Sequence, residues 1–460
     1  MLLVIALTPG LAFSYSSDSA FTVVPHWNAL PSGPEKASKS VADCEKTCVP
    51  PECNQWTYNL NSGHCRVSAS TKWIGAALDH TTSGCIPDVV SGCPHSPPPP
   101  SPSPPSPAYD GVLRSDPDGS TVAYMIPPYK SNHASTIEVL GDGVSLVAAW
   151  FSGEKEEAAG CAIVFARLLP NATGWSTAAT LSKRAQYSNQ NPVLFYDTPS
   201  QVLYLYHSQA PAESGESSAT IVMLNSTDNG VTWSKPAQWL TTPGAFPRNR
   251  IIPTLTEGVL FPYYNAGKAD PTFKENYSLM GRCEDASKDL ASAAVGWKFT
   301  PVPKSGDLVQ PSVVRLQPSQ PKLLGLFRDR RAKNIYRATS MDDGLTWSEP
   351  KASVLPNNNA GIEANILGTG EVVLAYNPQT SGRDPLGFAM SSDGGATWPH
   401  KRLLQHGDSS SGVATNSGSG NEFSYPTVMQ TKDGMIHVMY TYNRETIKYK
   451  RFARSWIAGK

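Results

Sequence analysis

The sequence has no excess of charge of either sign. Its 460 residues contain 38 Lys and Arg and 38 Asp and Glu, so the formal net charge is zero, and charged residues make up only 17% of the chain. A nucleic-acid-binding protein carries a basic surplus, and a long-helix or coiled-coil protein carries less proline and more charge. The 40 prolines and 36 glycines instead indicate a turn-rich β protein.

Long hydrophobic runs are also missing. The first twelve residues, MLLVIALTPGLA, are apolar but too short to span a bilayer, and small and polar residues follow them. We interpret residues 1–16 as a secretory signal peptide; because no Lys or Arg precedes the apolar run, a buried first strand or a truncated gene model is the alternative. No later stretch predicts a transmembrane segment. No metal-ligand cluster or phosphate-binding glycine loop is evident, so we expect no metal and no cofactor.

Cysteine is scarce outside one short segment. The spacings there are C-x3-C, C-x4-C and C-x11-C, which favour disulfides over a zinc site, since zinc sites use paired C-x2-C spacings and histidines. Disulfides imply an oxidising compartment, so we expect a protein that is secreted, extracellular or associated with the cell wall. The N-x-S/T sites at Asn171, Asn225 and Asn276 agree with this location. The six clustered cysteines are Cys44, Cys48, Cys53, Cys65, Cys85 and Cys93.

The chain divides into three segments after the signal peptide. Residues 21–93 contain the strings ADCEKTC, CNQWTYN and GHC, and this segment resembles a PAN/apple domain. The resemblance implies a small disulfide-rich fold that binds protein or carbohydrate. Residues 94–107 are a proline-rich linker, which we interpret as a semi-rigid spacer. Residues 108–460 form the third and largest segment.

The third segment contains an internal repeat. The pattern S-x-D-x-G-x-T-W occurs as STDNGVTW, SMDDGLTW and SSDGGATW, with tryptophans at 233, 347 and 398. The tryptophans at 175 and 297, each after a glycine, extend the series to spacings of 58, 64, 50 and 51 residues. In such a string the aspartate accepts backbone N–H bonds, the glycine takes a positive φ, and the tryptophan is buried between sheets.

Six short β runs accompany these turns. They are VSLVAAWF, QVLYLYHS, GVLFPYY, KLLGLF, EVVLAYN and MIHVMYTY, and we interpret each as the middle of a four-stranded sheet. Radial repeats of this size predict an all-β, six-bladed β-propeller. The repeated strings resemble the Asp boxes of the sialidase superfamily, which implies a sialidase-type propeller with Asp boxes on the turn side, away from the axial pocket.

The resemblance also implies a catalytic plan. In that family three arginines bind the substrate carboxylate, a tyrosine attacks the anomeric carbon, a glutamate takes the tyrosine proton, and an aspartate is the acid/base. A neutral tyrosine suits a sugar with a carboxylate on its anomeric carbon, because an anionic nucleophile would be repelled. Guanidinium groups suit the carboxylate because they bind it with two parallel hydrogen bonds.

The resemblance to the sialidase superfamily assigns candidate site residues to individual blades. The string FSYPTVMQ places Tyr425 at the nucleophile, and SGRDPLGFAM places Arg383 at the third arginine. In LLGLFRDRRAK, Arg328 is the best match to the second arginine, with Arg330 or Arg331 close behind. In the loop FSGEKEEAAG, Glu157 or Glu156 falls where the family has its acid/base aspartate.

Two positions depart from the family pattern. His133, in SNHASTIEV, stands where the first arginine is expected, and Gln310, in VQPSVVRL, replaces the glutamate base. A glutamine cannot take a proton, so Glu363 and Glu422 are candidate substitute bases. Arg444, near the C-terminus, is a further candidate for the axial site.

Three functions remain open at this stage. The first is a secreted sialidase-like glycoside hydrolase acting on terminal acidic sugars. The second is a lyase or hydrolase of uronic-acid glycans, since His133 and Tyr425 could remove a proton next to a carboxylate that arginine neutralises. The third is a non-catalytic carbohydrate-binding propeller. All three predict a glycan or glycoconjugate as partner and no nucleic acid.

Overall fold

The computed structural model describes residues 108–267, 276–286, 290–407 and 421–458, the strands β1–β5, β29 (Ala414–Thr415) and β30 (Gly418–Ser419), and the side chains of Cys44 and Cys65. The chain forms two compact units, Met1–Ser106 and Pro107–Lys460. The predictions for residues 1–16 and 94–107 fall outside the described residues. None of the described helices is long and apolar enough to cross a membrane.

The N-terminal unit contains one antiparallel sheet and one described disulfide. The strands lie in the order β1-β5-β3-β4-β2. Cys44 and Cys65 are joined by a disulfide and are buried. The prediction of disulfides is confirmed for this pair, while the side chains of the other four clustered cysteines lie outside the described residues. The strands are β1 (Thr22–Asn28), β2 (Glu35–Ala37), β3 (Gln55–Asn59), β4 (His64–Ser68) and β5 (Ala76–Cys85).

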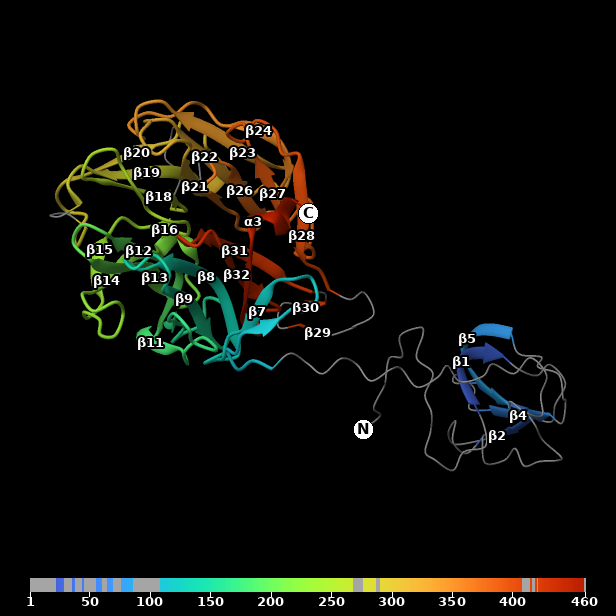
Figure 1. Ribbon diagram of the computed structural model, residues 1–460. Coiled ribbons are helices and arrows are strands. Elements are labelled where there is room, and N and C mark those ends of the chain that lie inside the picture. Colours follow the sequence, from blue (N-terminus) through green and yellow to red (C-terminus); the bar gives the residue numbers. More distant parts are fainter. Residues whose placement is uncertain are drawn as a thin grey trace. The chain divides into compact units, whose positions relative to one another are not determined.

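The second unit is a six-bladed propeller, as the sequence predicts (Figure 1). We number the blades I to VI along the chain. They consist of blade I, β8 (Ser131–Val139), β9 (Leu146–Gly153), β10 (Ala162–Leu168) and β11 (Ala179–Ser182); blade II, β12 (Tyr187–Asp197), β13 (Val202–Pro211), β14 (Thr220–Ser226) and β15 (Ala237–Leu240); blade III, β16 (Ala245–Pro247), β17 (Ile252–Pro253), β18 (Val259–Asn265), β19 (Tyr277–Cys283) and β20 (Trp297–Pro301); blade IV, β21 (Leu308–Arg315), β22 (Leu323–Asp329), β23 (Asn334–Ser340) and β24 (Lys351–Pro356); blade V, β25 (Glu363–Ile366), β26 (Val372–Tyr376), β27 (Leu386–Ser391) and β28 (His400–Gln405); and blade VI, β31 (Phe423–Gln430), β32 (Ile436–Tyr442), β33 (Thr446–Phe452), β7 (Thr121–Tyr124) and β6 (Arg114–Ser115).

The ring closes by pairing the two ends of the unit. In blade VI, β7 from the start of the propeller pairs antiparallel with β33 from its end. The first strand of blade I, β8, also lies beside the first strands β12 and β31 of its two neighbours. A short 3-10 helix, η1 (Glu216–Ser218), a C-terminal helix, α3 (Arg454–Ala458), and the two-stranded sheet of β29 and β30 complete the described elements of this unit. Closure protects the sheet edges that an open array of blades would expose.

The six predicted β runs are the second strands of the six blades. They correspond to β9, β13, β18, β22, β26 and β32, each paired on both sides. All six strands are buried along their whole length or nearly so, which explains why they read as continuous apolar runs and not as alternating ones.

The three Asp boxes form the turns between third and fourth strands. In blade II, the Asp228 carboxylate accepts hydrogen bonds from the backbone N–H of Thr232 at 2.8 Å and from its hydroxyl at 2.5 Å. The Ser226 hydroxyl accepts from the N–H of Gly230, whose φ is 80°. The bonds from Thr232 hold the pKa of Asp228 at about 2. Trp175 lies in the same kind of connection, whereas Trp297 opens β20 directly.

Replacing the Asp-box tryptophan of blade IV should strongly destabilise the propeller. Trp347 is buried and belongs to a core cluster with Leu260 of blade III and Leu323 of blade IV, so its ring joins the two blades. We expect Trp347→Ala to lower the free energy of unfolding by about 3–5 kcal/mol, because it opens a cavity between packed sheets. Denaturant unfolding measures this change. Val354→Ala, at a 75% exposed site in β24, is the matched control, and an equal loss in both variants would contradict the assignment.

Candidate active site

Four first strands carry the same backbone irregularity. The pairing register shifts in β8, β12, β21 and β31, and one residue at each shift has a left-handed φ between 47° and 55°. These residues are Ala134, Asn191, Gln310 and Tyr425. A β-bulge of this kind bends the strand and re-aims a side chain, and here it recurs at the same end of four blades. The bulges therefore prepare one site around the axis.

Tyr425 lies at the centre of this site. Its hydroxyl oxygen accepts a hydrogen bond from Nη1 of Arg328 at 2.5 Å and a longer one from Nε2 of Gln310 at 3.5 Å. The ring centroids of His133 and Tyr425 are 4.2 Å apart. Gly361 leaves room for this arrangement, because a Cβ there would meet the Gln310 oxygen and the Tyr425 ring at 3.2 Å. The predicted nucleophile thus meets three of the predicted binding residues.

Three guanidinium groups surround the Tyr425 ring. Their central carbons lie 5.3 Å (Arg248), 5.6 Å (Arg328) and 5.3 Å (Arg383) from the ring centroid. Burial alone would raise the pKa of Tyr425, but the charges of Arg328 and Arg383 outweigh burial and lower this pKa below its usual value. Arg248, from the connection between β16 and β17, was not predicted from the sequence.

A chain of ion pairs lies beside this group. Glu422 accepts from Arg383 at 2.6 Å and from Arg444 at 3.0 Å, and Arg444 also donates to Glu156 at 2.6 Å. Burial raises the pKa of Glu422, but Arg383 and Arg444 more than reverse this effect, so the pKa is lowered and the carboxylate is ionised. These contacts place the predicted residues Glu156 and Arg444 within one network.

His133 is neutral in this setting. Its Nδ1 lies 2.7 Å from the hydroxyl of Thr441, and its Nε2 lies 3.5 Å from Nη2 of Arg444. Complete burial, followed by the charges of Arg444 and Arg383, holds the pKa of His133 well below its usual value. The imidazole therefore contributes no positive charge to the site at neutral pH.

Glu157 lies in the neighbouring loop of blade I. It lines a small recess together with Gln190 of β12 and Phe246 of β16. Partial burial, followed by the nearby charge of Glu156, raises the pKa of Glu157. A carboxyl group that stays protonated to higher pH suits the role of a general acid.

The structure places Glu363 and Arg330 in other contacts. Glu363 is buried and forms an ion pair with Arg250 at 3.1 Å. Arg330 forms an ion pair with Glu216 of η1. In the described part of the chain, neither residue has a hydrogen bond to Tyr425, so of the two substitute bases considered, only Glu422 lies within the network described above.

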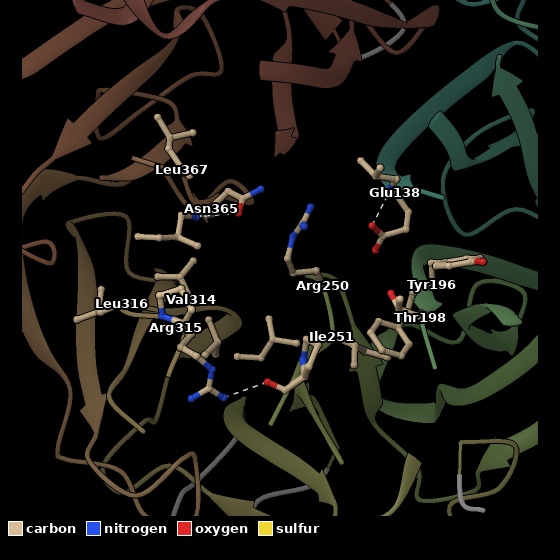
Figure 2. Close-up of a pocket in the computed structure, with 18 of the residues that line it drawn as sticks. Glu138, Tyr196, Thr198, Arg250, Ile251, Val314, Arg315, Leu316, Asn365 and Leu367 are labelled. Atoms are coloured by element: carbon tan, nitrogen blue, oxygen red, sulfur yellow. Dashed lines mark hydrogen bonds between the residues drawn. The ribbon is translucent and has the colours of Figure 1, made fainter. Parts of the chain in front are cut away.

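A separate cavity opens at the opposite end of the first strands, near the Asp boxes. It measures about 580 Å³, and its lining includes Ile251, Val314 and Leu367. Figure 2 shows Glu138 and Arg250 facing its open middle. Burial raises the pKa of Glu138 to about 7. Because none of the residues around Tyr425 lines this cavity, its size does not identify it as the chemical site.

Within the described residues, no group of three or more His, Cys, Asp and Glu side chains could hold a metal ion. The site around Tyr425 is instead defined by guanidinium groups, one phenol and carboxylates. Guanidinium groups are suited to an anionic group because they can donate paired hydrogen bonds to it.

Comparison with known proteins agrees with this fold. The solved structures it resembles include the Hadza microbial sialidase Hz136, with a TM-score of 0.59 and 15% identity over 72% of this chain and 67% of that one. They also include the intramolecular trans-sialidase of Ruminococcus gnavus in complex with oseltamivir carboxylate, with a TM-score of 0.58 and 13% identity over 74% of this chain and 98% of that one. The leech intramolecular trans-sialidase is a third, with a TM-score of 0.59 and 11% identity over 86% of this chain and 76% of that one.

The fold and the Asp boxes define a six-bladed propeller of the sialidase type. The chain belongs to the family of proteins with a BNR repeat-like domain, whose family model matches residues 144–438. A curated relative, a sialidase of Bacteroides fragilis (strain YCH46), is 27% identical over 221 residues. That match covers 44% of this chain and 38% of the relative, so it spans well under half of either protein.

Proposed function

We propose that this protein is a sialidase-like glycosidase that removes a terminal acidic sugar from a glycan. The observation that carries the proposal is the convergence of Arg248, Arg328 and Arg383 on the Tyr425 ring, with the Arg328 guanidinium 2.5 Å from its hydroxyl. A nucleophilic oxygen beside several guanidinium groups suits a sugar whose carboxylate lies next to the reacting carbon.

In the first step, Arg328 and Arg383 bind the substrate carboxylate and orient the sugar. Tyr425 attacks the anomeric carbon as a phenolate, its proton having gone to solvent, and the bond between that carbon and the leaving oxygen breaks. Glu157 donates its proton to the leaving oxygen, which departs as an alcohol, and a glycosyl–tyrosine bond has formed.

In the second step, the Glu157 carboxylate takes a proton from water. The water oxygen attacks the anomeric carbon, the bond to Tyr425 breaks, and the free sugar and the original tyrosine oxygen are regenerated. Two displacements at one carbon retain its configuration. We therefore expect the first product to carry the same anomeric configuration as the substrate.

The test is an assay of the full chain on a fluorogenic sialoside, a sialylated oligosaccharide and a polyuronate. Release of sialic acid from the first two supports the proposal. If none of the three substrates releases an acidic sugar, the proposal is wrong. In that case, saturable binding of a sialylated oligosaccharide without turnover would identify a non-catalytic carbohydrate-binding propeller.

A specific observation favours a second candidate, an elimination reaction on uronic-acid glycans. The ring of neutral His133 lies 4.2 Å from the Tyr425 ring, measured between centroids, and Gln310 occupies the place expected for a carboxylate base. In such a reaction one of the two rings takes the proton next to the carboxylate, the neighbouring carbon–oxygen bond breaks, and a double bond forms. The departing oxygen takes a proton from the other ring or from water and leaves as an alcohol. A new near-ultraviolet absorption from the unsaturated product, with no sialic acid released, would select this candidate.

The raised pKa of Glu157 predicts the alkaline limb of the pH profile. An acid must be protonated, so activity is expected to fall as the pH rises through the pKa of Glu157. Glu157→Gln should abolish this limb and reduce turnover of a sialylated oligosaccharide by about 10²–10⁴-fold. It should reduce turnover of an aryl glycoside far less, since a good leaving group needs no proton.

Turnover rates of the unmodified protein and Glu157→Gln, measured against pH on both substrates, test this prediction. Glu154→Gln, at an exposed carboxylate in the same loop, is the matched control and should keep the full profile. Equal losses on the two substrates would remove Glu157 from the acid role.

We also propose that the protein is secreted and that the N-terminal unit is a PAN/apple-like module that binds protein or carbohydrate. The Cys44–Cys65 disulfide supports both statements, because disulfides form in oxidising compartments. Detection of the protein in culture medium, with its N-terminus cleaved near residue 16, tests the first of them.

A further inference from the structure

The charges around Tyr425 do not balance when they are paired. Arg383 and Arg444 share the carboxylates of Glu422 and Glu156 in one chain of ion pairs. Slightly further out, Arg250 pairs with Glu363 and Arg330 pairs with Glu216. Among the residues that the structure describes, no carboxylate forms an ion pair with either of two remaining arginines, Arg248 and Arg328.

Arg248 is completely enclosed. It is 1% exposed, its Nη1 and Nη2 donate to the backbone carbonyls of Ser135 and Pro426 at 3.3 Å and 2.9 Å, and its Nε has no hydrogen-bond partner. Its charge lies directly against the Tyr425 ring, at 5.3 Å from the centroid. The charge of Glu363 also acts on Arg248, but this carboxylate forms its ion pair with Arg250. Carbonyl groups solvate a cation in part, but burying a cation without a counter-ion of its own is costly, so a further anion is expected nearby.

Arg328 is also buried, and its donors are directed at neutral groups. Its Nε donates to the amide oxygen of Asn359 at 2.9 Å, and its Nη1 donates to the hydroxyl oxygen of Tyr425 at 2.5 Å. Gln310 offers a second donor, Nε2, to the same oxygen at 3.5 Å. Both side-chain atoms brought to the Tyr425 oxygen are therefore donors. A phenolate oxygen can accept both of these hydrogen bonds, whereas a neutral phenol must also find an acceptor for its own proton.

From this geometry we propose that Tyr425 is ionised at neutral pH and serves as the missing counter-ion of Arg248 and Arg328. The proton goes to solvent, and a phenolate oxygen accepts from Arg328 and Gln310. The glutamine at position 310 stabilises this state, because its Nε2 donates to the anion, whereas the carboxylate of a glutamate would repel the anion and favour the protonated phenol. This state departs from the neutral tyrosine that the family resemblance implies. The guanidinium groups of Arg248, Arg328 and Arg383 around the ring offset the repulsion between a phenolate and a substrate carboxylate, so the nucleophile needs no base.

The groups facing Tyr425 from the surrounding elements support this state. Arg328 comes from β22, Arg248 from the connection between β16 and β17, and Arg383 from the connection between β26 and β27, and all three favour the anion. His133 from β8 is neutral, since its pKa lies well below its usual value. Glu156 opposes ionisation, but Arg444 binds its carboxylate.

When Tyr425 is ionised, one of the two unpaired arginines still lacks a counter-ion, and the ligand can supply it. One phenolate offsets one of the two unpaired arginines, and a substrate carboxylate would offset the other. This consequence rests on the proposed function, whereas the ionisation of Tyr425 is a property of the unliganded protein and can be measured without any substrate.

The experiment compares near-ultraviolet absorption of the full-length protein with that of Tyr425→Phe at neutral pH. We expect the difference to be the tyrosinate band of a single residue. Tyr204→Phe is the matched control: burial raises the pKa of Tyr204, so its difference should be that of a neutral phenol. A neutral-phenol difference for Tyr425 as well would overturn the proposal.

A second variant keeps the test decisive if Tyr425→Phe does not fold. Gln310→Glu changes few atoms and places a carboxylate beside the Tyr425 oxygen, which should return the proton to the phenol and remove the tyrosinate band. Identical spectra for Gln310→Glu and the unmodified protein would overturn the proposal. A tyrosinate band without sugar release would reject the proposed function alone, and sugar release without the band would reject the ionisation alone.

Discussion

Tyr425→Phe is expected to lower kcat for release of an acidic sugar by about 10³-fold or more, because it removes the only oxygen that can form the covalent bond. The substitution keeps the ring that packs against His133 and beside the guanidinium groups. Substrate binding should therefore survive, and the loss should fall on kcat and not on KM.

Steady-state kinetics on a fluorogenic sialoside measures this effect, with unfolding curves to show that the variant is folded. Tyr204→Phe removes a hydroxyl from β13, outside the group around Tyr425, and should keep its full activity. An unchanged kcat in Tyr425→Phe would exclude a covalent role for this residue and would leave the elimination or binding functions to be tested.

The fold was predictable because its signals are local. Each Asp box is complete within eight residues, since the threonine donates to the aspartate and the glycine N–H donates to the serine hydroxyl inside a single turn. The second strands read as apolar runs because both of their faces are buried. Such features need no knowledge of the rest of the chain, and their spacing gives the number of blades.

The site was predictable only in part. Tyr425, Arg328 and His133 were assigned by resemblance to a family, and the structure brings them together. Arg248 was missed because its place depends on the neighbours of blade III: a cation in the string FPRNR reads as solvent-exposed until Ser135 and Pro426 are known to cover it.

A weak sequence signal for the bulges does exist. Asn191, Gln310 and Tyr425 each precede a proline, at the same point of three first strands. Proline supplies no N–H to the ladder, so a repeated X-Pro near the start of a strand indicates a bulge. Blade I shows the bulge without the proline, at Ala134, which is why the pattern alone would not have located every member.

Glu363 shows why ion pairing could not be read from the sequence. As a carboxylate just after the string NNNAGI, it was a reasonable substitute base. Its oxygen instead lies 3.1 Å from Nε of Arg250, a residue 113 positions earlier in the chain. Which arginine meets which glutamate depends on the depth of each residue along the axis, and the bulges change that depth by a residue in some blades only.

Arg328→Met should have the second large effect on catalysis. It removes the donor at 2.5 Å from the Tyr425 oxygen and one of the groups proposed to bind the substrate carboxylate. We expect kcat/KM to fall by about 10²–10³-fold, as when a single donor to a developing charge is lost. Because the charge of Arg328 lowers the pKa of Tyr425, its loss raises that pKa, and the remaining activity should require a higher pH than the unmodified protein.

Two further variants separate this effect from a loss of stability. Arg337→Met, in the same blade, removes an arginine that donates to the carbonyl of Gly395 in an Asp box, and it should leave kcat/KM and the pH profile unchanged. Arg328→Lys keeps the charge without the two-pronged geometry, so it should restore the pH profile while kcat/KM stays low. Equal losses in Arg328→Met and Arg337→Met would mean that Arg328 supports the blade and not the chemistry.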